Sequence, residues 1–149
     1  MENFTNRIGN PWMRTLLKSR LHGLLGEGLA LVIVRGRRTG NRIEVPVEVR
    51  TVWGELIAVS LHDRTWWRNL RDHTDTTLWL HGQPAEVSVE IVEDLPTVQA
   101  WLAGLLLEHP VAARYLKVPS DAAGQPQAAP LLAAAQQRVI AVFRPRVAR

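Results

Sequence analysis

The chain has 149 residues, of which 46% are hydrophobic and 21% are charged, a composition typical of globular proteins and not of disordered ones. It contains no cysteine, which excludes disulfides, thiolate metal sites and cysteine nucleophiles. The net charge is +4, and all but two of the 18 basic residues are arginine, whose guanidinium stays protonated at every accessible pH.

These properties predict one domain, residues 1–149, with no membrane span. A chain of this length buries enough apolar surface to fold by itself. Its longest apolar runs, residues 29–34 and 101–107, are far shorter than the roughly 20 residues of a membrane helix. Polar residues begin at Glu2 and no secretory signal follows, so we expect a cytoplasmic protein.

An amphipathic helix is predicted over about residues 10–26. Asn10-Pro11 is typical of a helix start, apolar residues recur at three- and four-residue spacing, and Gly26 is a stop signal. The opposite face carries three basic residues, Arg14, Lys18 and Arg20. Two interpretations stay open here: the helix packs on the domain, or its basic face makes a peripheral contact with a membrane.

Six strands are predicted along the rest of the chain. Residues 29–35 form a continuous apolar run, and residues 42–50 alternate, so the two form a hairpin around a turn at 36–41. The alternation predicts one apolar face, with Ile43, Val45, Val47 and Val49, and one face with Glu44, Pro46 and Glu48. Pro46 cannot donate a ladder hydrogen bond, which predicts a sheet edge or a bulge. The other strands are expected at residues 56–61, 76–80, from 83 to about 92, and 138–144.

Helices are predicted between these strands. The segment "HDRTWWRNLRD" fits two helical turns capped by Asp63 or Thr65. Asp94 can cap a longer helix that ends near His109, and an alanine-rich helix is expected at residues 131–137 after a flexible loop, "PSDAAGQPQAAP". This order predicts a small antiparallel barrel at about 29–92 and 138–144, with a helical insert at about 94–137.

An arginine-rich turn connects the first two strands. Four guanidinium groups crowd the segment: Arg35, Arg37, Arg38 and Arg42. Their mutual repulsion is lowest when they share an anion, which favours a phosphate or carboxylate site. A solvated basic hairpin is the alternative, and the spacing alone does not decide between them.

A second cluster, "VSLHDRTWWRNL", follows the third strand. It offers backbone amides, the Ser60 hydroxyl and aromatic faces, which suit a planar anionic ligand. Because Trp66 and Trp67 are adjacent, we expect one in the core and one at a pocket. His62 is interpreted as an exposed or hydrogen-bonded residue, and the histidines show no metal-ligand spacing. With no catalytic triad, dinucleotide fingerprint or phosphate loop, we expect an organic cofactor to supply the chemistry.

The motifs "GRRTGNRIEVPVEV" and "VSLHDRTWWRNLRD", with "NPWMRTLL" before them, resemble those of the deazaflavin-dependent nitroreductase family of flavin and deazaflavin oxidoreductases. The resemblance covers residues 10–91. It implies a mainly β fold with helices, the split β-barrel of the FMN-binding type. It also implies that the cofactor is coenzyme F420, a deazaflavin with a phosphate-linked polyglutamate tail.

The resemblance further implies a set of site residues. The phosphate and tail carboxylates would be held by Arg37, Arg38, Thr39 and Arg42. The deazaflavin ring would be bordered by Val45 and Pro46. Backbone and hydroxyl contacts near the ring would come from Val59, Ser60 and Leu61. The pocket would be shaped by Trp66, Trp67 and Asn69.

The chain departs from the family pattern in two places. Only residues 61–65 separate the third strand from the tryptophans, where the family has a longer loop with a basic residue and a glycine. The family lines its substrate pocket with several tyrosines, and this chain has only Tyr115. Ser60 and Tyr115 are therefore the candidate catalytic residues.

These observations predict an F420-dependent reductase that transfers hydride to a small molecule such as a quinone, an enone or a nitroaromatic compound. FMN is the alternative cofactor, although its single phosphate needs fewer arginines. A non-catalytic carrier of a deazaflavin, FMN or haem-like pigment is the alternative function. Nucleic-acid binding is not expected, because most tryptophans lie on helices or beside apolar runs. Split barrels often pair through one sheet, so a homodimer stays open.

Overall fold

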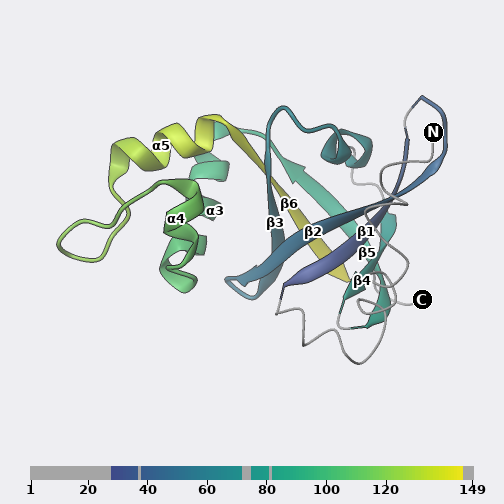
Figure 1. Cartoon of the computed structure of the whole chain (residues 1–149), viewed down its shortest axis with the longest axis horizontal. Helices are drawn as coiled ribbons and strands as arrows, with labels where there is room; N and C mark the ends of the chain where they lie inside the picture. Colours follow the sequence, from purple (N-terminus) through teal and green to yellow (C-terminus); the bar gives the residue numbers. More distant parts are fainter. Residues whose placement is uncertain (1–27, 37, 72–74, 81, 146–149) are drawn as a thin grey trace.

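The computed structural model describes residues 28–36, 38–71, 75–80 and 82–145. The helix predicted at residues 10–26 and the side chain of Arg37 lie outside this part. The described strands form a closed barrel in the order β1-β2-β3-β6-β5-β4, and every neighbouring pair is antiparallel (Figure 1). The predicted antiparallel barrel with inserted helices is confirmed.

The strands are β1 (Leu29–Arg35), β2 (Arg42–Val52), β3 (Glu55–Leu61), β4 (Asp75–Leu80), β5 (Gln83–Val92) and β6 (Arg138–Pro145). The helices are η2 (Trp66–Leu70), α3 (Leu95–Glu108), α4 (Ala112–Leu116) and α5 (Ala128–Gln136). Among the described residues, no helix is both long and apolar enough to cross a membrane.

The antiparallel pairing brings several chain segments to one end of the barrel. Arg35 pairs with Arg42 where β1 ends and β2 begins, and Leu61 pairs with Arg138 where β3 ends and β6 begins. The arginine-rich turn, the end of β3, η2 and the start of β6 therefore share one end. We call it the upper end, as it is drawn in Figure 1.

Two apolar cores follow from the alternation of side chains along the strands. Ala58 and Phe143 belong to the core inside the barrel, whereas Ile57 and Ile140 belong to a second core beneath the helices. Strands β3 and β6 each contribute one of these residues to each core, because side chains alternate between the two faces of a strand. The helical layer thus covers the outer face of β3 and β6 and leaves the upper end clear of α3 (Figure 1).

Strand β2 changes partner along its length. Its first part pairs with β1, with Pro46 opposite Leu31, and its pairing with β3 covers only Val49 to Val52. Pro46 therefore lies where β2 has β1 as its ladder partner, so the missing N–H breaks no bond to β3. The barrel is closed and β2 is not an edge strand, but at Pro46 it pairs with β1 alone.

The short helix after β3 differs from its prediction. η2 is a 3-10 helix, and its N-cap Thr65 makes no side-chain capping hydrogen bond. The predicted side-chain cap is wrong there, and the predicted helical segment forms as a 3-10 helix, because five residues give too few backbone hydrogen bonds to favour the α form. The cap predicted for α3 is confirmed, since the Asp94 carboxylate accepts the Thr97 N–H at 3.1 Å.

The helical insert is more ordered than predicted. Helix α4 was missed, and its C-cap residue, Lys117, has a left-handed φ of 59°. The loop expected to be flexible is closed by a β-bridge between Ser120 and Pro126. Within it, the Asp121 carboxylate accepts the N–H groups of Ala123 and Gln125 at 2.9 Å each. The Asp121 side chain thus accepts backbone hydrogen bonds that a helix or strand would otherwise satisfy, and it holds the loop in shape.

The β2–β3 turn holds the helical layer in place at the opposite end of the barrel. The Trp53 N–H donates to the Glu108 carboxylate at 3.0 Å, and the Trp53 ring lies 5.1 Å from the Trp101 ring. A Cβ at Gly104 would lie 2.5 Å from the Trp53 ring, so glycine permits this close approach. These contacts fix α3 against β2.

An ion-pair network on the outer face of the barrel predicts a pH effect on stability. Arg144 bonds Glu55 at 2.6 Å and Glu90 at 2.7 Å, and the hydrogen bond from Arg144 lowers the pKa of Glu55. A lowered folded-state pKa contributes stability above the unfolded pKa, and this stability is lost as pH falls through the folded value. Because the network is partly exposed, we expect Glu55→Gln to cost about 0.5–1 kcal/mol at pH 7.

The measurement is urea unfolding of the wild-type chain and of Glu55→Gln at pH 7 and at pH 3. The difference between the two proteins should be smaller at the lower pH, because protonation of Glu55 in the wild-type chain removes the charge that bonds Arg144. A difference that stays the same at both values would contradict the electrostatic explanation.

Candidate functional site

Backbone hydrogen bonds shape the arginine-rich turn. The Gly36 N–H donates to the Asn41 carbonyl at 2.9 Å, and the Gly40 N–H donates to the Gly36 carbonyl at 2.8 Å. The Thr39 hydroxyl accepts the Asn41 N–H at 3.1 Å, and Gly40 has a φ of +73°, which glycine adopts without strain. The sequence Thr-Gly-Asn therefore gives an ordered turn on which arginine side chains are displayed.

The arginines of this turn have different surroundings. The Arg35 guanidinium donates to the Gly40 carbonyl at 3.2 Å and so braces the turn. Arg42 lies 3.6 Å from the carboxylate of Glu44, which is buried although the alternation predicted it on a polar face. Arg38 is exposed and, within the described part of the chain, has no hydrogen-bond or ion-pair partner. Of the described arginines in this turn, Arg38 is thus the one that an external anion can meet without breaking an internal contact.

Two further predicted site residues lie on β2, on opposite faces of the strand. Val45 packs against the core inside the barrel, whereas Pro46 points to the other face. Their side chains cannot border one side of a ring together. The structure does not bring this predicted pair together.

Ser60 lies at the upper end of β3, on the strand face that points into the barrel. It is 7% exposed, and its hydroxyl donates to the Leu61 carbonyl at 3.1 Å. Val59 points the other way and packs against the core beneath the helices. Ser60 is therefore the one side chain of the predicted Val59–Leu61 set that faces the barrel interior at this end.

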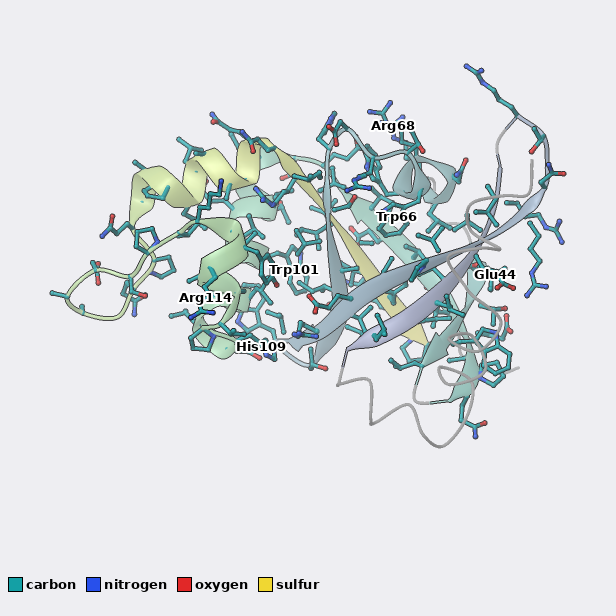
Figure 2. All side chains as sticks on the ribbon, in the orientation of Figure 1. Glu44, Trp66, Arg68, Trp101, His109 and Arg114 are labelled. Carbon is teal, nitrogen blue, oxygen red and sulfur yellow. The ribbon has the colours of Figure 1, made fainter. Side chains whose placement is uncertain are left out.

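Trp67 is the core member of the tryptophan pair. It is 0% exposed, and the guanidinium carbons of Arg68 and Arg71 lie 5.1 and 5.0 Å from its ring centroid. The His62 ring lies 5.5 Å from the same indole. Trp66 is only half-buried and lies beneath η2 against the barrel interior (Figure 2). One tryptophan is thus buried and the other presents an aromatic face at the upper end.

Two donors on η2 are buried without an acceptor in the described part of the structure. They are the indole N–H of Trp67 and the Nε–H of Arg68. A buried donor without an acceptor costs about 1–3 kcal/mol, so such groups favour a bound acceptor atom. The donor set of η2 therefore suits a ligand with carbonyl, ring-nitrogen or phosphate acceptors.

Tyr115 belongs to a different surface. It lies on α4 beside a small cavity of about 50 Å³ on the outer face of β2 and β3, which Val59 also lines. Burial, and then the Glu48 carboxylate, raise the pKa of the Tyr115 phenol, so it stays protonated at neutral pH. Since Val59 and Ser60 point to opposite faces of β3, Tyr115 and Ser60 lie on opposite sides of the sheet. A shared catalytic role for them stays a prediction that the geometry does not favour.

Comparison with known proteins supports the fold. By sequence, the chain matches no family model and no curated protein. A conserved hypothetical protein from Mycobacterium tuberculosis superposes with a TM-score of 0.52 and 15% identity, covering 85% of this chain and 78% of that one. A protein described as a domain-swapped dimer superposes with a TM-score of 0.50 and 15% identity, covering 94% of this chain and 99% of that one.

A third solved structure, described as an F420 reductase, gives a TM-score of 0.45 and 18% identity, covering 85% of this chain and 93% of that one. The structures with the higher scores share the fold with this chain. The predicted fold class, a mainly β split barrel with helices, is confirmed.

The sequence analysis missed the cations around Trp67. Arg68 and Arg71 pack on this indole, and Arg71 makes a bidentate ion pair with Glu93 at 3.0 and 3.1 Å. The sequence could have indicated that Arg68 and Arg71 lie together, because residues three apart lie on one face of a 3-10 helix. Glu93, by contrast, comes from the end of β5 and could not be placed before the barrel was known.

Proposed function

We propose that this chain binds coenzyme F420 at the upper end of the barrel and passes its hydride to a small organic acceptor. One observation carries the proposal: the barrel topology places the two motifs of the family resemblance, far apart in sequence, at the same end. The arginine-rich turn supplies cations there, and Ser60 with η2 supplies a half-buried aromatic and polar surface.

The residues present fit this cofactor in two parts. Arg38, Thr39 and Arg42 are exposed on the turn and suit a long polyanionic tail, which an FMN phosphate would only partly occupy. Trp66 and the buried donors of Trp67 and Arg68 suit a planar ring that carries acceptor atoms. Asn69 is half-buried on η2, beside these residues.

In this proposal the chain holds the cofactor and the acceptor in position, and the cofactor carries out the chemistry. The bound cofactor supplies a hydride when reduced. Arg38 and Arg42 hold the anionic tail through charge-assisted hydrogen bonds. Trp66 keeps water away from the ring, and the Ser60 hydroxyl offers a hydrogen bond at the strand end, where a polarised oxygen of ring or acceptor would lie.

A carrier function is the second candidate. The specific observation in its favour is the separation of Ser60 and Tyr115 by the β3 sheet, which leaves the site without a tyrosine beside Ser60. A protein that only binds the cofactor needs no such group. Pairing of two copies through one sheet stays a prediction of the sequence.

The first test is a fluorescence titration of the chain with coenzyme F420 and, in parallel, with FMN. We expect saturable quenching by F420 with a Kd of about 1–10 μM and binding of FMN at least about tenfold weaker. No quenching by either would overturn the proposal. Oxidation of reduced F420 by cyclohexenone or menadione then separates the reductase, which accelerates it, from the carrier, which does not.

A further inference from the structure

The outer face of β1 carries an apolar strip on the side of the barrel away from α3, α4 and α5 (Figure 1). Leu29, Leu31 and Ile33 alternate with the barrel-core residues of this strand and so point outward. Pairing places Pro46 on one side of Leu31 and Trp79 on the other. Because residues directly opposite each other share a face of the sheet, the strip continues onto β2 and β4.

Leu31 is fully buried although it points away from the barrel interior. It is 0% exposed and belongs to neither of the two apolar cores. Its neighbours across the ladders, Pro46 and Trp79, are themselves only half-buried. Two side chains beside a leucine do not exclude water from its outward end. The burial of Leu31 therefore calls for a cover over this face.

The carboxylate of Glu44 is buried on the same face, since β2 places Glu44 opposite Ile33. Glu44 is 4% exposed, and the guanidinium of the exposed Arg42 lies 3.6 Å from its carboxylate, beyond hydrogen-bond range. A buried carboxylate is stable when cations and hydrogen-bond donors surround it. The cover of this face should therefore be apolar and should bring a cation with it.

Residues 10–26, which lie outside the described part of the chain, have both properties. Of the sequence outside that part, this stretch alone carries an apolar stripe at helical spacing. Leu16 and Leu24 belong to the stripe, and Arg20 lies four residues from each, so the three share one helix face. Spacing thus places Arg20 on the apolar stripe, and not on the basic face to which its charge assigned it.

The chain enters β1 where this segment ends. Gly28 has a φ of +92°, a left-handed conformation in which helices commonly end, and its carbonyl accepts the Val49 N–H. A helix over residues 10–26 would be about 25 Å long, and the seven residues of β1 span about 23 Å. A helix that turns back at Gly28 therefore matches the strip in length. Because helical side chains lean toward the N-terminus, Arg20 would then reach along β1 toward Glu44.

We propose that residues 10–26 form a helix that docks on the outer face of β1, with its apolar stripe over Leu31 and with Arg20 paired to Glu44. The proposal goes beyond the proposed function and does not depend on a cofactor. It also decides between the two interpretations of this segment, because a stripe that is buried on the barrel is not free to enter a membrane surface.

The first experiment detects the docked segment directly in the full chain. Leucine methyl groups are ¹³C-labelled, and the NOEs of the Leu31 methyls are recorded by NMR. We expect contacts from Leu31 to at least one of Leu17, Leu21 and Leu24. Leu116 is the matched control, because it is buried in the core beneath the helical layer and should show no contact to these three residues.

Three outcomes are distinguished by this measurement. Contacts within one chain support the docking. Contacts that appear only between labelled and unlabelled chains in a mixed sample mean that a second copy covers the face, and they overturn the proposal. Absence of contacts also overturns it, and cosedimentation with phosphatidylglycerol vesicles would then assign the stripe to a membrane surface.

The second experiment tests the ion pair by a double-mutant cycle in the full chain. We expect Glu44→Gln and Arg20→Gln each to lower the urea midpoint of unfolding, and the double variant to lower it by less than the sum of the two shifts. Lys18→Gln is the control, because its position lies away from the stripe, and its shift should add to that of Glu44→Gln. Additive shifts for Arg20 and Glu44 would overturn the pair. If Glu44→Gln fails to fold, Glu44→Asp enters the cycle, since it keeps the charge on a shorter side chain.

Discussion

Replacing Trp67 with alanine lowers the free energy of unfolding by about 3–5 kcal/mol. Trp67 is the largest fully buried side chain among the described residues, and η2 places it at the upper end, where η2 contacts β1 and β5. Removing the indole leaves a cavity and also takes away the surface on which Arg68 and Arg71 pack. The measurement is urea unfolding followed by circular dichroism.

Trp66→Ala is the matched control, since it removes the same side chain from the neighbouring position. Trp66 is only half-buried, so we expect a loss of about 1–2 kcal/mol. If Trp67→Ala fails to fold, Trp67→Phe keeps an aromatic ring in the core and should cost less than the alanine variant. Equal losses for the two alanine variants would contradict the assignment of Trp67 to the core.

The strands could be predicted because their signals are local. Continuous apolar residues indicated β1, and the alternation in β2 correctly placed Val47 and Val49 toward the barrel interior. The alternation failed to predict the burial of Glu44, which depends on what covers its face of the sheet. The 3-10 form of η2 was missed because the choice between helical forms over five residues is made by packing.

The candidate site was less accessible to sequence reasoning. The motifs indicated Arg38, Ser60 and the tryptophans, but a motif does not say which face of a strand a residue occupies, and Val45 and Pro46 proved to point in opposite directions. A depression lined by Leu61, His62, Asp63, Gln136 and Gln137 could not be found from the sequence at all. Its other wall, Gln137, is brought there by the pairing of β3 with β6, and such long-range pairing leaves no local signal.

Arg38→Ala should weaken F420 binding by about 1.5–3 kcal/mol, which is about a 10- to 150-fold rise in Kd. Arg38 makes no internal ion pair with the described residues, so a charge-assisted bond to the tail adds to binding without replacing an existing contact. For the same reason, the free energy of unfolding should change by less than about 0.5 kcal/mol. Arg38→Lys should recover part of the affinity, because it keeps the charge but not the bidentate geometry.

Arg114→Ala is the control for charge alone. Arg114 is an exposed arginine on α4, whereas Arg38 follows β1 at the upper end (Figure 2). Replacing Arg114 therefore changes the net charge by the same amount as replacing Arg38 but leaves the arginine-rich turn intact. A tail bound at the turn makes Kd sensitive to Arg38 and not to Arg114, and the Arg38 effect should diminish with rising salt. If both variants bind F420 with the wild-type Kd, Arg38 contributes no tail contact. The arginine-rich turn is then a solvated basic hairpin, because a charge that is surrounded by water alone has little effect on the free energy of unfolding.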